Sequence, residues 1–381
     1  MPKAKRTSSV PQIFSDNKDK SPRDIAVLIG DKYANFDFAP GQIEMEPADK
    51  PGRKHYRCLY PTGVSLWALC RLFDLTEETK YLDFVERSFD FYISQERLKY
   101  RTIDEGGAVA HALLELNKRR PKETYLRLLR DITLHYEHHQ PRLLDGSFCF
   151  EFETWRRRTW LDALFMLCPL LAKSAELMRQ PGRYDDVLRQ FFNYTVRLQD
   201  PEIRLYHQGW GWGINRTRHS PGFWSRANGW LSMAFIEVLK GVPADREGRD
   251  ELLELFQKFC GAVAKVQDPS GRWHQLLTHP DSFEETSATS MFVYSFLEGY
   301  GKGWLSDSFK ESALRGFEGL KEKIDKEGNI YGTCIGTSTQ NTLGDYDRRE
   351  TPLNDWHGQG PVILAACAVA AAAQQCASGC L

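Results

Sequence analysis

The feature that most constrains the fold is a succession of helical patterns along nearly the whole chain. Apolar residues recur at spacings of three and four, and with the helix start and stop signals they predict about twelve helices. The predicted helices cover residues 24–34, 63–73, 80–95, 106–117, 122–138, 159–178, 183–199, 226–240, 248–267, 286–301, 306–325 and 360–374. Such a chain is predicted to be all-α.

A second pattern lies in the connections between these helices. Asp145-Gly146, Asp200-Pro201, Asp268-Pro269 and Asp325 each begin a turn that leads into a short extended piece, mostly aromatic-rich. The turns recur at intervals of roughly 55–70 residues, which indicates a repeated unit of helix, turn, helix and short hairpin. Six such pairs in a closed ring leave no exposed end. We therefore predict an (α/α)6 barrel with short β-hairpins in its connecting loops.

Composition narrows the domain organisation and the partners. Residues 1–20 are polar and predict a flexible tail, and no linker interrupts residues 21–375, so residues 21–381 are predicted to form a single catalytic domain. The net charge of −1 does not indicate a nucleic-acid or membrane partner. The N-terminus lacks the apolar run of a secretory signal, so we expect a cytoplasmic protein, with a removed signal peptide as the alternative. The sequence does not indicate an oligomeric state.

Several kinds of chemistry have no motif in this chain. The nine cysteines are scattered without a CxxC pair. The sequence has no HExxH, GxSxG, P-loop or GxGxxG, which argues against a zinc protease, a serine hydrolase, an NTPase and a dinucleotide enzyme. We therefore predict no metal and no cofactor.

The segment Phe223–Trp230 is the strongest functional signal. Arg226 lies between Trp224 and Trp230, and His207 precedes them in Tyr206-His207-Gln208-Gly209-Trp210. Indole faces stack on the apolar side of a sugar ring, and a guanidinium binds a carboxylate through two parallel hydrogen bonds. The combination predicts a site for a sugar acid. A tryptophan-rich core with one satisfied arginine is the alternative.

Two carboxylates stand at the starts of predicted helices. Asp162, in Trp160-Leu161-Asp162, lies among apolar residues, and burial there would raise its pKa and favour a proton-donating form. Asp104 precedes another apolar helix. A carboxylate pair that faces one cavity is what acid–base chemistry on a sugar requires. The alternative is that both cap their helices, and the case for capping is stronger at Asp104.

A ring of helix pairs would bring such residues together. The starts of the inner helices line one mouth of the ring, and Trp160, Asp162, Trp224, Arg226 and Asp104 all lie at such starts. His357, in Asn354-Asp355-Trp356-His357-Gly358, precedes the last helix. It is a candidate to hydrogen-bond a ligand, with a structural histidine as the alternative.

Taken in order, these segments resemble the unsaturated rhamnogalacturonyl hydrolases of glycoside hydrolase family 105 and, more distantly, the unsaturated glucuronyl hydrolases of family 88. The similar stretches are Trp160-x-Asp162, Tyr206-His207-x-x-Trp210, Phe223-Trp224-x-Arg226-x-Asn228-Gly229-Trp230, Gly271-x-Trp273-x-Gln275 with Glu285-Thr286-Ser287-Ala288, and Asn354-Asp355-x-His357-Gly358-x-Gly360. The resemblance runs from about Tyr60 to the last helix and implies an (α/α)6 barrel.

The resemblance also implies a reaction. The substrate would be an oligosaccharide ending in a 4,5-unsaturated uronic acid, as polysaccharide lyases leave. Asp162 would be the general acid/base that protonates the C4=C5 bond and activates water, and Asp104 would assist. The residues that match positions holding the sugar are Trp160, His207, Trp224, Arg226 and Trp230, with Tyr60 as a weaker match and His357 in the closing segment.

The sequence departs from the family pattern at Ser225 and Ala227, and residues 151–158 lack the histidine expected before Trp160. The neighbouring sugar, which is rhamnose in the family, is therefore left open, and so is the uronate, among galacturonyl, glucuronyl and ulvan-type products. An ordinary (α/α)6 glycosidase, a sugar epimerase and a non-catalytic sugar-binding toroid are the alternatives. The presence of both Asp104 and Asp162 argues against the last.

Overall fold

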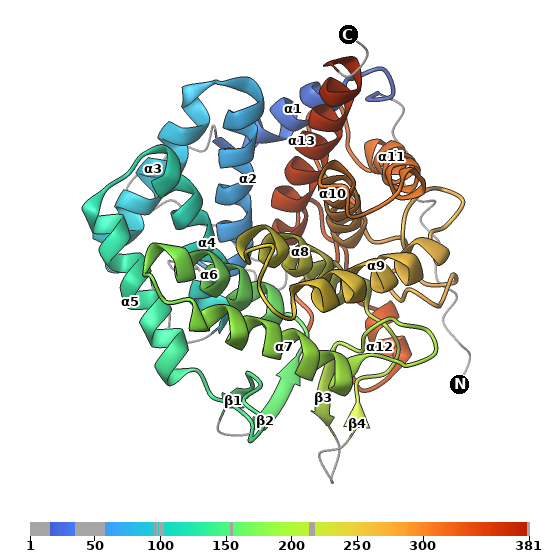
Figure 1. The fold of residues 1–381 in the computed structure, drawn as a ribbon. Coiled ribbons are helices and arrows are strands. Elements are labelled where there is room, and N and C mark those ends of the chain that lie inside the picture. The colour runs from blue at the N-terminus through green and yellow to red at the C-terminus, as the bar shows by residue number, and fades with distance from the viewer. Residues whose placement is uncertain are drawn as a thin grey trace.

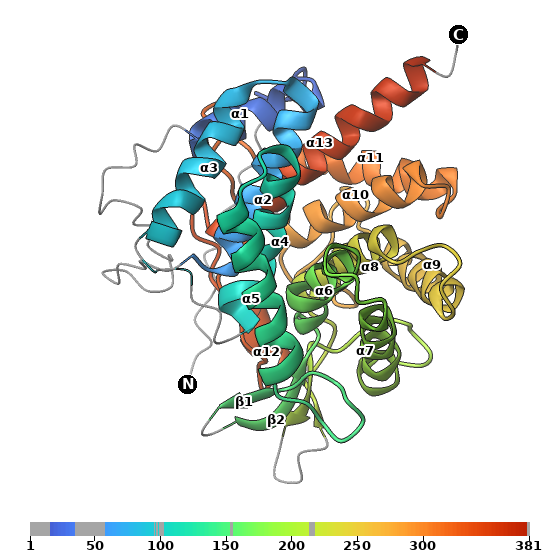
Figure 2. The same ribbon diagram turned by 60° about the vertical axis from the view of Figure 1, so that its left-hand side comes forward.

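A computed structural model describes residues 16–34, 58–94, 96, 98, 103–152, 155–212 and 218–378 of the chain. Its long helices form two concentric layers (Figures 1 and 2). The inner helices are α2 (Tyr60–Thr76), α4 (Ile103–Arg119), α6 (Ala163–Leu177), α8 (Ser225–Gly241), α10 (Thr286–Gly301) and α13 (Trp356–Ser378). The outer helices are α1 (Pro22–Ala34), α3 (Thr79–Ser94), α5 (Glu123–His139), α7 (Gly182–Leu198), α9 (Arg249–Lys265) and α11 (Asp307–Lys321).

The inner helices close into a ring. Each packs on the next in the order α2, α4, α6, α8, α10, α13, and α13 packs back on α2. The inner helices contact neighbours on both sides and the outer layer, so they are apolar nearly all round, and every residue of α8 from Ser225 to Leu239 is buried. The outer helices bury one face only. The structure confirms the predicted (α/α)6 barrel.

The inner helices touch through their backbones near their first turns. A Cβ on Gly107 of α4 would lie 1.6 Å from the carbonyl oxygen of Met166 in α6. A Cβ on Gly63 of α2 would lie 2.8 Å from the backbone of Val109 in α4. Any side chain at these two positions would push the helices apart. The glycines therefore hold the ring tight at the end where the inner helices begin.

The predicted turns are present, and each has the same construction. A side-chain oxygen of Asp145, Asp200, Asp268 and Asp325 accepts a hydrogen bond from the backbone N–H two residues further on, at 2.9–3.1 Å. This short aspartate turn reverses the chain after an outer helix. Isolated β-bridges such as Gln199 with Tyr206 and Ile324 with Ile330 then close the hairpins.

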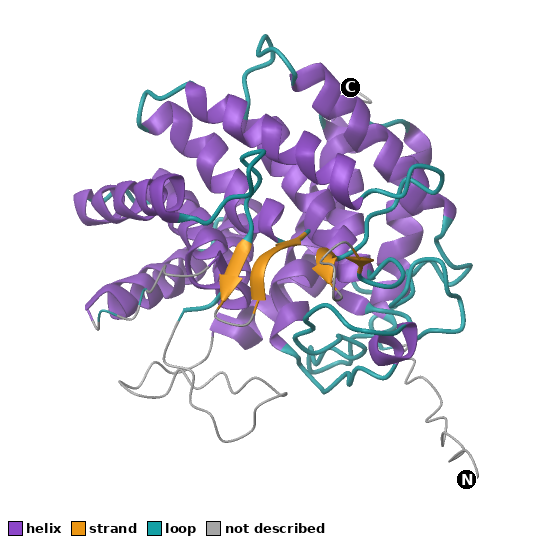
Figure 3. Cartoon of the chain, turned by 90° about the horizontal axis from the view of Figure 1, so that it is seen from below, coloured by secondary structure: helices purple, strands orange, loops and turns teal. Residues whose placement is uncertain are grey.

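Four short strands lie across the end where the inner helices begin (Figure 3). They are β1 (Phe150–Phe152), β2 (Trp155–Trp160), β3 (Gly209–Trp212) and β4 (Arg218–His219), paired antiparallel in that order. The predicted helix 159–178 was wrong at its start, because Thr159 and Trp160 pair with Trp210 and Gly209 of β3 instead. A further helix that was not predicted from the sequence is α12 (Leu343–Asp347), a single turn with a Thr342–Asp345 capping box.

Two further segments are more buried than their composition alone would suggest. Residues 16–20 belong to the predicted tail, but the buried Asn17 side chain donates hydrogen bonds to the backbone oxygens of Ile324 and Asp325 at 2.7 and 3.0 Å. Residues 1–15 lie outside the described part. The stretch Trp356–Gln374 of α13 is long and apolar enough to cross a membrane by length and composition, but most of it is buried inside the barrel.

Charged side chains fill the opposite end of the ring, around a cavity of about 290 Å³. Lys173 Nζ lies 2.5 Å from Glu237 Oε2 and 3.2 Å from Glu115 Oε1, and Lys240 Nζ lies 2.9 Å from Glu237 Oε1. Burial opposes the negative charge of Glu237, but these lysines hold its pKa well below the usual range. The buried charges are therefore compensated.

His111 is buried next to this cluster. Its Nε2 lies 3.7 Å from Glu237 Oε2, and the Trp67 ring packs on its ring at 4.7 Å. Neither ring nitrogen has a hydrogen-bond partner among the described residues. Burial and then the charge of Lys173 lower the pKa of His111 to about 3. The imidazole is therefore neutral at neutral pH.

We expect the His111→Phe substitution to reduce the acid sensitivity of folding. The folded-state pKa of His111 lies below its unfolded value, so its contribution is complete above about pH 6.5 and is lost as pH falls. Linkage gives a loss of about 2 kcal/mol in the free energy of unfolding between pH 7.5 and 5. Urea unfolding of both proteins at the two pH values measures the difference, and equal losses would contradict the assignment.

Candidate active site

Asp162 lies between the last residue of β2 and the first turn of α6. The Leu161 N–H donates to the carbonyl oxygen of Gln208 at 2.8 Å, and the backbone oxygen of Asp162 accepts from the N–H groups of Phe165 and Met166. The Asp162 side chain makes no capping hydrogen bond to α6 and is half-buried. The capping alternative is therefore wrong for Asp162.

The surroundings of Asp162 include a buried phenol. Burial, and to a smaller extent the charge of Asp162, raise the pKa of Tyr346. The Tyr346 hydroxyl donates to Gln208 Oε1, and Gln208 Nε2 donates to the carbonyl oxygen of Thr337 at 3.0 Å. Gln208 thus ties the strand next to Asp162 to the loop that carries Thr337.

Trp160 ends β2 with a partly buried indole. Its direct cross-strand partner is Gly209, which has no side chain to cover that face of the sheet. On its other side the indole packs on Phe150, with ring centroids 4.6 Å apart. Of the three predicted indoles, this one is the most suited to stack on a sugar.

The partners of His207 fix its tautomer. Nδ1 lies 2.9 Å from the carbonyl oxygen of Ser220 and 3.1 Å from that of Gly222. Carbonyl oxygens only accept, so Nδ1 carries the proton and Nε2 is the acceptor. Burial and then the stacked ring of His219, 4.6 Å away, lower the pKa of His207. This side chain can therefore accept a hydrogen bond from a sugar hydroxyl.

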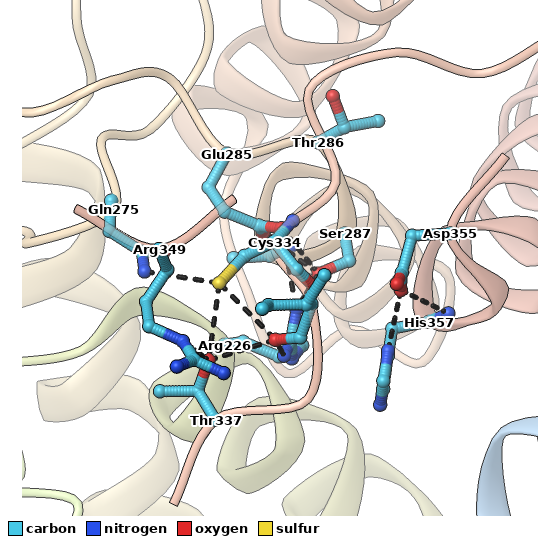
Figure 4. Close-up of polar contacts among 12 residues, drawn as sticks. Arg226, Gln275, Glu285, Thr286, Ser287, Cys334, Thr337, Arg349, Asp355 and His357 are labelled. Atoms are coloured by element: carbon cyan, nitrogen blue, oxygen red, sulfur yellow. Dashed lines mark hydrogen bonds and ion pairs between the residues drawn. The ribbon is translucent and has the colours of Figure 1, made fainter. Parts of the chain in front are cut away.

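Arg226, Trp224 and Trp230 are buried beneath the mouth of the ring and are called its floor. Figure 4 shows the polar contacts of Arg226. Its side chain is 1% exposed, and its terminal nitrogens donate to the carbonyl oxygens of Cys334 and Ile335, the latter at 2.6 Å. Nη1 lies 3.6 Å from Glu285 Oε1. Burial disfavours the guanidinium charge, but its neighbours, including Glu285, keep the pKa of Arg226 above its usual value. In the structure this arginine holds the loop after residue 333 rather than facing an open surface.

Trp224 and Trp230 are also part of this floor. The Arg226 guanidinium lies over the Trp224 ring at 4.7 Å, and Trp224 Nε1 donates to Gln275 Oε1 at 3.1 Å. Trp230 stacks on Phe165 at 4.8 Å. Both indoles are buried, so the geometry favours a supporting role for them. Direct contact with a sugar remains a prediction that fits Trp160, His207 and Tyr60 better.

Tyr60 and His357 come together from the first residues of α2 and α13. The Tyr60 hydroxyl lies 2.8 Å from His357 Nε2, and the Tyr60 ring meets the edge of Trp230 at 5.9 Å. Asp104 is the second residue of α4, but its side chain lies outside what the structure describes. Apart from His207, which lies between α7 and β3, the predicted residues lie at or next to the starts of inner helices, although Arg226 and two indoles lie below the surface.

Three residues that hold the loops around the site in place, Glu285, Gln208 and Tyr346, were not singled out from the sequence. Glu285 caps α10 by accepting from the Ala288 N–H at 2.6 Å and also accepts from the Cys334 N–H at 2.9 Å. Gln208 and Tyr346 link β3 to α12. Glu285 and Gln208 belong to the quoted motifs, but Tyr346 carries no local signal. Within the described residues there is no cluster of His, Cys, Asp or Glu that could hold a metal ion.

A closed ring of inner helices with a half-buried aspartate, an indole and imidazoles at one mouth defines a carbohydrate-active enzyme of the (α/α)6 class. The sequence matches the family model of Glycosyl Hydrolase Family 88 over residues 38–373. The chain belongs to this family and is a glycoside hydrolase.

Individual relatives agree with the family. The chain is 25% identical over 307 residues to an unsaturated rhamnogalacturonyl hydrolase of Bacillus subtilis, covering 79% of this chain and 86% of that protein. It is 27% identical over 197 residues to an unsaturated 3S-rhamnoglycuronyl hydrolase of Formosa agariphila, covering 49% and 52%. A Clostridium acetobutylicum glycoside hydrolase from family 105 superposes with a TM-score of 0.79 at 25% identity, covering 90% of this chain and 98% of that one.

We expect Arg226→Lys to loosen the floor of the site. A lysine has one nitrogen where the guanidinium uses two in fixed positions, so it cannot reproduce both hydrogen bonds with the same geometry, and the free energy of unfolding should fall by about 1–3 kcal/mol. Urea unfolding measures this loss. Arg249→Lys is the matched control, because Arg249 also donates to two backbone carbonyls but at the far end of α8.

The same pair of variants separates the two roles of Arg226 in kinetics. If it supports the loop, Arg226→Lys should raise KM together with the loss of stability, while Arg249→Lys should lose stability with KM unchanged. A raised KM with wild-type stability would instead show that Arg226 contacts the uronate directly.

Proposed function

We propose that this enzyme removes a terminal 4,5-unsaturated uronic acid from oligosaccharides by hydrating its C4=C5 bond, with Asp162 as general acid/base. The family and the substrates named for its relatives support this substrate class. The observation that carries the residue assignment is the position of Asp162. It is a half-buried carboxyl at the mouth of the ring that is not used to cap its own helix.

The proposed reaction needs a carboxyl group that first gives a proton and then takes one. Asp162 donates its proton to C4, a water molecule bonds to C5, and the carboxylate recovers a proton from that water. The product at C5 is a hemiketal. Its ring opening and the collapse of the resulting C1 hemiacetal release a keto-uronate and the remaining saccharide. Asp104 is proposed to assist at the same ring.

The residues around Asp162 suit a sugar ring. The Trp160 indole offers a face for the apolar side of the ring, and Nε2 of His207 can accept from a hydroxyl group. We propose that these two side chains, with Tyr60, hold the unsaturated sugar, and that Arg226 with Trp224 and Trp230 supports them from below. This arrangement does not distinguish among galacturonyl, glucuronyl and ulvan-type substrates.

We expect Asp162→Asn to lower the rate by about 10²–10⁴-fold with the fold unchanged, because an amide cannot cycle a proton. The assay follows loss of the ultraviolet absorbance of the unsaturated uronyl group, on lyase-digested pectin and ulvan. Asp131→Asn, on the exposed side of α5, is the control and should keep the wild-type rate. Retention of more than about a tenth of the rate by Asp162→Asn would exclude this role.

The saturated counterpart of the substrate should not be cleaved, because it offers no double bond to protonate. An ordinary glycosidase protonates the glycosidic oxygen and would accept both sugars. Parallel assays of saturated and unsaturated oligosaccharides decide between the two mechanisms. We also expect EDTA to leave the rate unchanged. Comparable release from the saturated sugar would favour the ordinary glycosidase.

A further inference from the structure

Tyr60, His357 and Asp355 form a hydrogen-bonded chain between two inner helices. The Tyr60 hydroxyl lies 2.8 Å from His357 Nε2, and His357 Nδ1 lies 2.5 Å from Asp355 Oδ1 (Figure 4 shows the His357–Asp355 half). Asp355 Oδ1 also accepts from the backbone N–H of His357 at 3.0 Å. The carboxylate is therefore fixed by the same residue whose ring it contacts.

The chemistry of Asp355 sets the direction of these bonds. An ionised carboxylate only accepts, so the proton on the neutral imidazole is at Nδ1 and Nε2 is an acceptor. The only hydrogen that can lie between Nε2 and the phenol is then that of the Tyr60 hydroxyl. Tyr60 donates inward to His357, so toward a sugar hydroxyl its oxygen can act only as an acceptor.

Burial shows which member of the chain can reach a ligand. Asp355 and His357 are both 2% exposed, whereas Tyr60, at the start of α2, is only partly buried. The Tyr60 ring packs on Trp230, and Trp230 stacks on Phe165, whose N–H donates to the backbone oxygen of Asp162. The chain therefore ends at the same mouth of the ring as Asp162.

From this geometry we infer that Asp355 is a positioning residue, which acts through His357 to hold the Tyr60 oxygen as a hydrogen-bond acceptor for a hydroxyl group of the unsaturated sugar. The inference rests on the proposed function for its substrate. Asp355 supplies the charge that fixes the imidazole tautomer, with the Nδ1 proton toward the carboxylate and Nε2 toward Tyr60. Tyr60 is the residue in contact with the sugar.

Asp355 also immediately precedes α13, so a helix cap is the competing explanation. Asparagine caps helices as well as aspartate does, so Asp355→Asn keeps the cap and removes only the charge. We expect this variant to unfold at the wild-type urea concentration and to lose at least about tenfold in kcat/KM. A loss of stability with kcat/KM unchanged would show that Asp355 only caps α13.

A double-mutant cycle with Tyr60→Phe tests whether Asp355 works through the phenol. If it does, Asp355→Asn should have no further effect on kcat/KM once the Tyr60 hydroxyl is gone. The same loss in both backgrounds would overturn the proposal. Asp268→Asn is the matched control, because Asp268 pairs with His274 Nε2 at 3.0 Å in the connection between α9 and α10, and its activity should equal wild type.

A readout that needs no substrate separates this proposal from the proposed function. The short bond between His357 Nδ1 and Asp355 should give a far-downfield proton resonance that persists in Tyr60→Phe and disappears in His357→Phe. If the wild-type protein shows this resonance but is inactive on every unsaturated oligosaccharide, the proposed function is wrong while the tautomer assigned to His357 stands. Its absence from the wild-type protein would refute the tautomer assignment.

Discussion

The site depends on close backbone contact between inner helices at their first turns. Gly107 lies directly against the carbonyl oxygen of Met166, and Gly63 lies against the backbone of Val109, where any larger residue would force the helices apart. Asp162 lies four residues before Met166, so this contact also fixes where the carboxyl group stands relative to α4. The catalytic candidates have short side chains and lie at the starts of neighbouring helices. They can contact the same substrate molecule only if those helix starts are close together.

The contacts in the floor of the site follow from the same close packing of the inner helices. Below the first turns the side chains of Arg226, Gln275 and Glu285 are buried, and buried polar groups need hydrogen-bond partners. Arg226 meets this need by binding two carbonyl oxygens of the loop after residue 333 and by pairing with Glu285, which in turn caps α10 and receives the Cys334 N–H. A planar guanidinium suits this task because it offers several donors in fixed directions. One buried ion pair thereby positions the loop that contacts Gln208.

The regular part of the molecule could be predicted because its signals are local. Helical periodicity and the aspartate turns were sufficient for the ring and for the placement of Asp162, Trp224 and Arg226 at inner helix starts. Pairing of Thr159 and Trp160 with β3 was not predictable, since it depends on a partner about 50 residues away in the chain. The role of Arg226 was ambiguous, because an arginine between two tryptophans fits a carboxylate site and a buried floor equally. Whether Asp162 or Asp355 caps its helix is likewise a matter of geometry that the residue type leaves open.

Three buried or half-buried imidazoles show how partners assign different tasks to one side chain. His111 has no hydrogen-bond partner among the described residues and lies near Lys173, so it behaves as a neutral core ring. The Nδ1–H of His207 is held by carbonyl oxygens, which fix the tautomer without supplying a charge to stabilise a second proton. Only His357, of these three, has a carboxylate on Nδ1 and a hydroxyl on Nε2. At the mouth of the ring, the Tyr60 hydroxyl therefore donates to a histidine whose tautomer is fixed by a charged group, whereas the tautomer of His207 is fixed by neutral carbonyl oxygens.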